Sequence, residues 1–173
     1  HNYLVDHVQV PARRLLMDEI NWNDRLIAIK GGRGVGKTDF LLNYAKELRT
    51  TNPELSKRTL YVNFNDFYFT EHSLVEFAGE FVAAGGHTLL IDQAFKYPNW
   101  SRELSQCYYN YKDLHIVFTA SSVMRLVEDN KDLCSIVHPY NLRGFSFREY
   151  LNVTLGLKLP AYSLEEILHN HID

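Results

Sequence analysis

Residues 31–38 read Gly31-Gly32-Arg33-Gly34-Val35-Gly36-Lys37-Thr38, a complete GxxxxGK[ST] phosphate-binding loop. The run before it, residues 25–30 (RLIAIK), is typical of a buried parallel strand, and residues 39–48 continue after it with helical periodicity. Glycines let the backbone curl so that successive N–H groups point at anionic oxygens, and the helix start adds its positive dipole end. This context predicts that the chain binds a nucleoside triphosphate.

The loop also assigns expected roles to single residues. The Lys37 ammonium is expected to reach the β- and γ-phosphates, and the Thr38 hydroxyl to hold Mg²⁺. The full set of expected nucleotide contacts is Gly31, Gly32, Arg33, Gly34, Val35, Gly36, Lys37, Thr38 and Asp39.

Length and composition set the limits of the fold. The 173 residues can form one core and are too few for two full domains. A hydrophobic share of 46% and a charged share of 23% are ordinary for a globular protein. The net charge of −3 gives no reason to expect a nucleic-acid surface. No apolar stretch approaches the roughly 18 residues that span a bilayer.

The two cysteines and the start of the chain point to a compartment. Cys107 and Cys134 lie far apart and outside any CxxC pattern, so we expect reduced packing residues. The start of the chain is polar and does not resemble a signal peptide. These features predict a cytoplasmic protein that does not associate with membranes.

Strand-like runs alternate with helical patterns along the chain, which predicts an α/β fold with a parallel sheet and helices on its faces. Ser73 is the expected N-cap of a helix over residues 73–84, with Glu76 at the capping-box position. Pro139 places the weakest strand at an edge or a bulge, and a further helix is expected from Phe145. The five predicted strands are residues 26–30, 59–64, 87–92, 114–119 and 136–142.

The third predicted strand closes on an acid, Asp92. After a phosphate loop, such an acid orients the Mg²⁺ shell together with Thr38; the alternative is that Asp92 only ends a strand in a turn. The next residue in hydrolysing ATPases of this plan is usually a glutamate that acts as general base, and here it is Gln93. An amide can position water but cannot take its proton at neutral pH. We therefore predict slow or absent turnover, whether the glutamate was replaced or is naturally missing.

Hydroxyl groups follow the fourth strand at the place where a γ-phosphate sensor would lie. Thr119 and Ser121 are the better candidates, and capping of the next helix is the alternative role for these residues and for Ser122. Asp66, beyond the second strand, is either an extra acid near the metal or a turn residue.

The segments GGRGVGKT, LYVNFND, LLIDQAFKYPNW, HIVFTASS and LRGFSFREYL together resemble a group of prokaryotic AAA-type ATPases. The resemblance covers roughly residues 10–155 and implies a three-layer P-loop NTPase sandwich with strand order 5-1-4-3-2. It also implies hydrolysis of ATP with Mg²⁺. In that group, a C-terminal domain resembling restriction nucleases typically follows the ATPase core. Residues 1–173 are accordingly expected to be a single AAA-type core from a longer protein.

Departures from the family pattern weaken the expectation of catalysis. Gln93 replaces the usual glutamate, and residues 132–137 lack the arginines that often act in trans as fingers. Arg125, Arg143 and Arg148 are expected to be structural or surface charges. Trp100 is expected to pack against the sheet, and residues 10–16 either contact adenine or present Arg13 and Arg14 to solvent.

Two functions of different class therefore stay open. The first is an AAA-type ATPase coupled to a homo-oligomer, a partner or a C-terminal domain, and the second is a nucleotide-binding switch or scaffold that holds ATP without consuming it. A kinase is disfavoured because no Arg-rich lid follows the third strand, and a GTPase because no [NT]KxD sequence is present.

Overall fold

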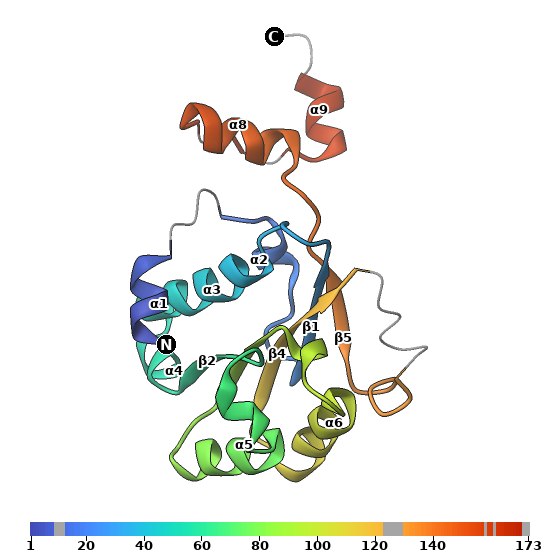
Figure 1. Cartoon of the computed structure of the whole chain (residues 1–173). Helices are drawn as coiled ribbons and strands as arrows, with labels where there is room; N and C mark the ends of the chain where they lie inside the picture. The colour runs from blue at the N-terminus through green and yellow to red at the C-terminus, as the bar shows by residue number, and fades with distance from the viewer. Residues whose placement is uncertain (9–12, 123–129, 158, 161, 171–173) are drawn as a thin grey trace.

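A five-stranded parallel sheet forms the centre of the computed structural model, in the order β2-β3-β4-β1-β5 (Figure 1). The predicted order 5-1-4-3-2 is the same arrangement, so the fold prediction is confirmed. The structure describes residues 1–8, 13–122, 130–157, 159–160 and 162–170. The strands are β1 (Leu26–Gly31), β2 (Thr59–Asn63), β3 (Thr88–Asp92), β4 (His115–Ser121) and β5 (His138–Asn141).

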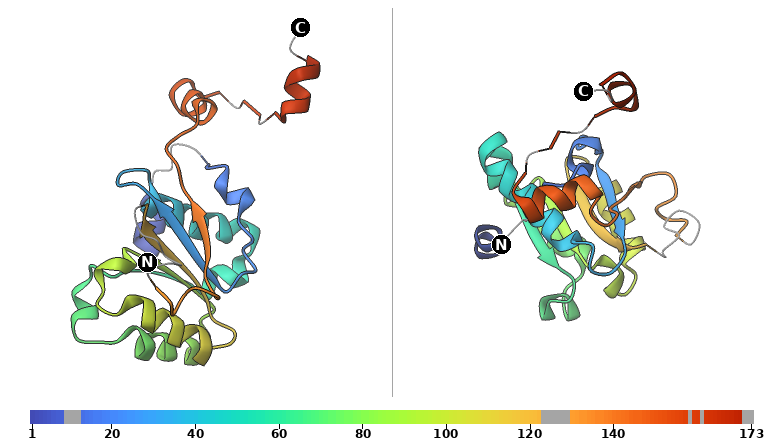
Figure 2. Two further views of the ribbon diagram at one scale, coloured as in Figure 1. Left: turned by 90° about the vertical axis from the view of Figure 1, so that its right-hand side faces the viewer. Right: turned by 90° about the horizontal axis from the view of Figure 1, so that it is seen from above.

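Helices cover both faces of the sheet and make the outer layers of the sandwich. Helix α3 lies on one face, together with α1, while α5 and α6 lie on the other (Figure 1). The helix that follows β5 and the next one along the chain project from the sandwich (Figure 2). The helices are α1 (Asn2–His7), α2 (Leu16–Glu19), α3 (Lys37–Thr51), α4 (Pro53–Lys57), α5 (Leu74–Ala83), α6 (Trp100–Asn110), α8 (Phe147–Leu155) and α9 (Leu164–Asn170), with 3₁₀ turns η1 (Phe67–Thr70) and η2 (Ala94–Lys96).

Two apolar cores hold the layers together, and strand geometry sorts the residues between them. Successive side chains of a strand point to opposite faces. In β1, Leu26 and Ala28 join the core under α5 and α6, whereas Ile27 and Ile29 join the core under α3. All four are at most 1% exposed, so the strand that leads into the phosphate loop is anchored from both sides.

Capping groups fix where several elements begin. Ser73 and Glu76 form the predicted capping box at the start of α5, with Glu76 N–H donating to Ser73 Oγ at 3.2 Å. The helix expected from Phe145 begins two residues later, because Ser146 is its N-cap and accepts from the N–H of Glu149. Pro139 lies in β5, which pairs only with β1 among the described residues, so its predicted edge position is confirmed.

Other expectations differ from the structure in detail. The fifth strand starts later than predicted, because the N–H groups of Ile136 and Val137 bond to the carbonyl of Leu133 and close a turn. Cys107 is buried under α5 and α6 as expected, but Cys134 is exposed, so the packing prediction is wrong for that thiol. Trp100 packs against Phe118 of the sheet with ring centroids 5.9 Å apart, as predicted. Within the described part of the chain, no helix has the length and apolarity to cross a membrane.

Candidate nucleotide-binding site

A cavity of about 710 Å³ opens where β1, β3 and β4 end and α3 begins. In a parallel sheet all carboxyl ends meet at one edge, and ligands bind outside that edge where the helices start. Residues from four separated segments line it: Gly31, Arg33, Gly34, Gly36, Lys37, Thr38, Asp39, Asp92, Gln93, Phe95, Lys96, Thr119 and Ser121. The site is thus assembled by the sheet topology from parts that are distant in sequence.

The loop between β1 and α3 has the backbone of an anion cradle. Gly34 and Gly36 have φ values of 82° and 90°, a region that disfavours any side chain. Gly36 is also the N-cap of α3 and offers no side-chain acceptor, so the first N–H groups of the helix are left to an external anion. At Gly31, a Cβ atom would lie 2.6 Å from the carbonyl oxygen of Leu142, so the close approach of β5 requires glycine there.

The Lys37 ammonium lies within the cradle. It donates to the carbonyl oxygens of Gly31 at 2.9 Å and Gly32 at 2.7 Å. Burial lowers the pKa of Lys37, and the nearby charge of Asp92 acts in the opposite direction. An ammonium carries three donors, so these two bonds hold the side chain against the loop and leave a donor for a phosphate oxygen.

The carboxylate of Asp92 is the polar centre of the cavity floor and is only 2% exposed. Its Oδ2 accepts from the Thr38 hydroxyl at 2.6 Å and from the Tyr61 hydroxyl at 3.1 Å. Burial and the adjacent Asp92 raise the pKa of Tyr61, which keeps that hydroxyl protonated as a donor. The loop and the end of β3 are therefore joined directly, although 54 positions separate Thr38 from Asp92.

Thr119 and Gln93 complete the surroundings of Asp92. The Thr119 hydroxyl donates to Asp92 Oδ1 at 2.6 Å and accepts from the N–H of Gln93 at 2.8 Å. The same N–H is 3.0 Å from Asp92 Oδ1, and Gln93 has a φ of 56°, so its backbone is pinned in the left-handed region. The single proton of Thr119 is used by Asp92, which makes Thr119 a positioning group in this arrangement.

The structure brings most of the predicted site residues together, but two of the loop residues lie elsewhere. Val35 packs against the core under α3, and Gly32 offers its carbonyl to Lys37; neither is among the residues that line the cavity. Asp66 accepts from the N–H of Tyr68 and caps η1, which agrees with its interpretation as a turn residue. Arg125 lies outside the described residues.

Sequence reasoning missed three side chains at this site. In the sequence, Tyr61 looks like another apolar residue of a buried strand. Only the alternation of side chains along β2 could have placed it on the α3 face together with Asp92. Phe95 and Lys96 follow Gln93 by two and three positions and line the cavity from η2. No local signal distinguishes these two from an exposed turn.

Arg14 is buried against the phosphate loop, so the prediction of a solvated side chain is wrong for this residue. The residue is 8% exposed, and its guanidinium bonds to Glu149 Oε1 at 3.1 Å and to the Val35 carbonyl at 3.1 Å. It also donates to the carbonyl oxygens of Arg143 and Gly144 and lies over the ring of Phe145. Arg13 is the exposed member of the pair and bonds Asp18 and Glu47. Arg14 therefore ties the loop to the start of α8.

The donor set can be tested against a bound Mg²⁺ ion. Across the described ranges, no group of three or more His, Cys, Asp or Glu side chains could hold a metal ion by itself. Thr38 and Asp92 nevertheless place a hydroxyl and a carboxylate 2.6 Å apart at the cavity floor. Mg²⁺ prefers oxygen ligands and usually keeps several waters beside one or two protein groups and substrate phosphates. The residues fit a metal that arrives with a phosphate ligand.

One curated relative shows how much of a longer protein this chain matches. The chain is 27% identical over 169 residues to the uncharacterized protein MJ1637 of Methanocaldococcus jannaschii. The match covers 91% of this chain and 34% of that protein, so the chain spans about a third of the length of its relative.

Solved structures of low sequence identity share the fold. Domain III of the replication initiation protein DnaA from Thermotoga maritima superposes with a TM-score of 0.54 at 17% identity, covering 88% of this chain and 66% of that one. PCH-2 of C. elegans gives a TM-score of 0.50 at 17% identity over 84% of this chain and 41% of that one. A DnaA structure bound to AMPPCP and single-stranded DNA also gives 0.50, at 16% identity over 96% and 59%. At this identity the likeness concerns the fold alone.

The family comparison is more specific. The AAA domain family (AAA_14) matches residues 23–151, which span every strand and the whole lined cavity. The chain therefore belongs to this family of AAA-type P-loop ATPase domains.

Proposed function

We propose that the chain binds ATP with Mg²⁺ in the cavity at the carboxyl edge of the sheet and hydrolyses it slowly. One observation carries most of this proposal: the 2.6 Å hydrogen bond between Thr38 and Asp92. It couples the phosphate loop to the acid that ends β3, which is the pairing that Mg²⁺-nucleotide binding requires.

In the proposed complex the loop and α3 supply most of the binding. The N–H groups around Gly34 and Gly36 bond the β-phosphate, and the uncapped start of α3 adds its dipole. Lys37 gives its remaining donor to the β- and γ-phosphates. Arg33 and Asp39 also line the cavity. Arg33 bonds phosphate oxygens through its guanidinium, whereas Asp39 contacts them through its backbone N–H and not through its carboxylate.

A Mg²⁺ ion bound there would neutralise charge that develops on the phosphates. Thr38 would hold it through its hydroxyl, and Asp92 would orient the water in its shell. Tyr61 and Thr119 keep Asp92 in place from both of its oxygens. Ser121, at the end of β4, lines the cavity and is the better placed of the two predicted sensor residues to meet the terminal phosphate.

Hydrolysis needs a group that takes the proton of the attacking water as the bond to the leaving ADP breaks. Gln93 is positioned beside the metal acid, but its amide cannot accept a proton at neutral pH. It can orient water by hydrogen bonding. Slow turnover follows from this difference.

A second candidate function is a nucleotide-binding switch or scaffold that holds ATP without consuming it. The pinned backbone of Gln93 favours it, because the amide stands where the family carries glutamate and two hydrogen bonds hold that position rigid. On the family resemblance alone, we also propose that residues 1–173 form one AAA-type core, followed in the complete protein by a restriction-nuclease-like domain. Control of that domain or of a homo-oligomer would then follow from nucleotide occupancy.

Two substitutions test the proposal. Lys37→Ala is expected to weaken binding of Mg²⁺-ATP by about 10–100-fold in calorimetric titration, because it removes the charged ligand from the cradle. Unchanged affinity would refute the phosphate-site assignment. Lys57→Ala serves as the matched control, since Lys57 is exposed on α4 and pairs with Glu54.

Turnover separates the two candidate functions. Gln93→Glu is expected to raise the rate of phosphate release by about 100-fold or more, the usual range of a general base. If neither the parent chain nor the variant releases phosphate while both bind ATP, the switch is the better description.

A further inference from the structure

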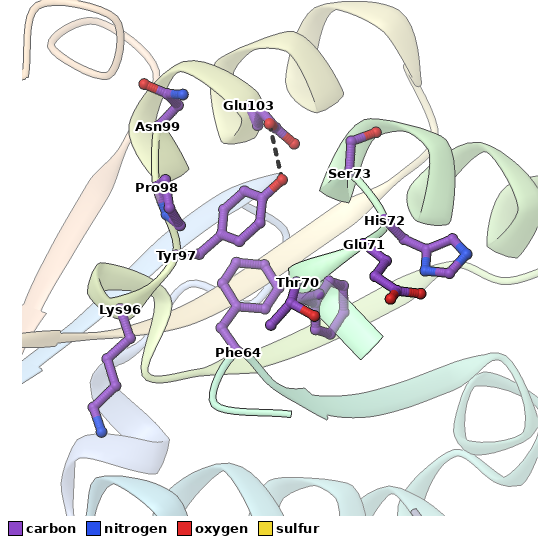
Figure 3. Close-up of a pocket in the computed structure, with 11 residues that line it drawn as sticks. Phe64, Thr70, Glu71, His72, Ser73, Lys96, Tyr97, Pro98, Asn99 and Glu103 are labelled. Carbon is purple, nitrogen blue, oxygen red and sulfur yellow. Dashed lines mark hydrogen bonds between the residues drawn. The ribbon is translucent and has the colours of Figure 1, made fainter. Parts of the chain in front are cut away.

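Lys96 lies between the nucleotide cavity and a neighbouring one. It lines the cavity of about 710 Å³ described above and also a cavity of about 500 Å³ bounded by Phe64, Tyr97 and Glu103. In the close-up, its side chain points away from the rings of Phe64 and Tyr97 (Figure 3). Its ammonium donates to Asn65 Oδ1 at 3.3 Å, a long bond that uses one of three donors.

The backbone that carries Lys96 is held at both ends. Gln93 and Asn99 are the two non-glycine residues with positive φ within the described part of the chain, at 56° and 57°. This backbone conformation is unfavourable for a residue with a side chain and persists only where the surrounding structure holds it in place. The N–H of Lys96 bonds to the Gln93 carbonyl at 3.0 Å, and the Tyr97 hydroxyl bonds to Glu103 at 3.0 Å. Lys96 therefore projects from a fixed point.

Strand order places that fixed point across the cavity from the phosphate loop. The loop follows β1, whereas Lys96 follows β3, and β4 lies between these two strands. Lys37 and the start of α3 occupy the β1 side, where in the proposed complex they hold the β-phosphate and the near side of the γ-phosphate. A phosphate chain extended past them toward Asp92 would bring only its terminal group to the side of Lys96.

The Lys96 ammonium changes the net charge of the cavity lining. Of the described residues that line it, Arg33, Lys37 and Lys96 are cationic, and Asp39 and Asp92 are anionic. Lys96 thus supplies the net positive charge of the lining. A triphosphate carries more negative charge than a diphosphate, and the extra charge is on the terminal group.

We infer that Lys96 is a ligand of the terminal phosphate. Its ammonium exchanges the bond to Asn65 for one to a γ-phosphate oxygen, and the site thereby discriminates ATP from ADP. The inference rests on the proposed nucleotide site. It adds to that site a residue that belongs neither to the phosphate loop nor to the end of β3. It also supplies within the chain a cation for the γ-phosphate, in a sequence that lacks arginines over residues 132–137.

Affinity for two nucleotides tests this role. The full chain and its Lys96→Met variant are titrated with AMPPCP and with ADP, both with Mg²⁺, by calorimetry. We expect AMPPCP affinity to fall about tenfold or more, the size of one charged hydrogen bond, and ADP affinity to stay within twofold. Lys96→Arg is expected to recover most of the AMPPCP affinity, and Lys57→Met, on an exposed lysine of α4, to change neither. Since Lys96 is exposed, its substitution should not affect folding, which circular dichroism verifies.

The other outcomes are equally informative. Equal losses for AMPPCP and ADP, or no loss for either, would overturn the terminal-phosphate role while leaving the nucleotide site intact. A parent chain that binds neither nucleotide would instead refute the proposed function, and the inference with it. Lys37→Ala distinguishes these cases, because it should lower the affinity for both AMPPCP and ADP.

Discussion

Two buried carboxylates lie near the phosphate loop, and they differ in the charge of their partners. Asp92 is 2% exposed and Glu149 is 6% exposed, so water solvates neither. Glu149 forms an ion pair with Arg14 at 3.1 Å. No cation among the described residues forms an ion pair with Asp92; its four described donors are two hydroxyls on one oxygen and a hydroxyl and an N–H on the other.

The difference separates a carboxylate paired with a cation inside the fold from one that we propose serves a ligand. Burial raises the pKa of Glu149, but hydrogen bonds from Ser146, Leu15 and Arg14 outweigh it, and the net pKa lies below its usual value. The Glu149 carboxylate bonds to Arg14 and to the N–H of Leu15 and so joins these residues to α8. Asp92 is held in place by neutral groups, so in the proposed complex its charge is available to the Mg²⁺ ion that accompanies the nucleotide.

Removing the cation of the structural pair is expected to have the largest effect. Arg14→Ala leaves Glu149 buried without its counter-charge, which typically costs about 3–5 kcal/mol. Urea unfolding should show this loss in the free energy of unfolding. Arg13→Ala is the matched control, because its side chain is 48% exposed and its ion pairs contribute at most about 1 kcal/mol. Equal losses at both positions would break the comparison.

Neutralising Asp92 should lower nucleotide affinity and leave stability nearly unchanged. In Asp92→Asn the amide oxygen can still accept from Gln93 N–H, and the hydroxyls of Thr38 and Tyr61 can turn to accept from the amide nitrogen. We expect the free energy of unfolding without ligand to change by less than about 1 kcal/mol. Affinity for Mg²⁺-ATP should fall about 10–100-fold, as for other groups that orient a metal shell.

Glu149→Gln is the counterpart that sharpens this contrast. It should destabilise the fold, because Arg14 is then buried without a carboxylate, and leave Mg²⁺-ATP affinity within a few-fold. Chemical denaturation and calorimetry on the same two variants give both readouts. If Asp92→Asn proved the more destabilising of the two, Asp92 would be a structural charge as well.

The smallest effect is expected from one donor of Asp92. Tyr61→Phe removes the hydroxyl that lies 3.1 Å from Asp92 Oδ2 while keeping the ring in the core under α3. A loss of about 1 kcal/mol in unfolding free energy is expected, the value of one buried hydrogen bond. Tyr109→Phe, on a side chain that is 53% exposed, should leave stability unchanged and serves as control. No loss at Tyr61 would mean that the remaining three donors suffice.

Local sequence patterns were enough for the fold and for much of the site. The parallel sheet, the Ser73 capping box and the edge position of Pro139 were predicted from local patterns and agree with the structure. The strand order came from the family resemblance, and it agrees as well. The loop from Gly31 to Thr38 and the acid Asp92 were recognised from their spacing and their strand context, and all of them except Gly32 and Val35 line one cavity. Their roles toward a nucleotide stay predictions.

The roles of Arg14 and Tyr61 could not be predicted for one shared reason, which is that each depends on a contact between distant segments. Arg14 could be a solvated residue or a ligand contact until α8 brought Glu149 to it from 135 positions away. Tyr61 gained its role only when β2 and β3 paired and placed its hydroxyl on Asp92. Cys134 was expected to pack, but its position in a turn exposes it.

By itself, the sequence determined that a strand, a glycine-rich turn and a helix form a phosphate cradle, because backbone curl and helix dipole are local properties of consecutive residues. Tertiary structure decided which groups face that cradle and which charges stay unpaired. Four neutral donors converge on Asp92, one arginine neutralises Glu149, and Lys96 lines the same cavity as Lys37. These outcomes depend on strand order and burial, and Coulomb interactions in a low dielectric are set by distance in space and not by distance along the chain.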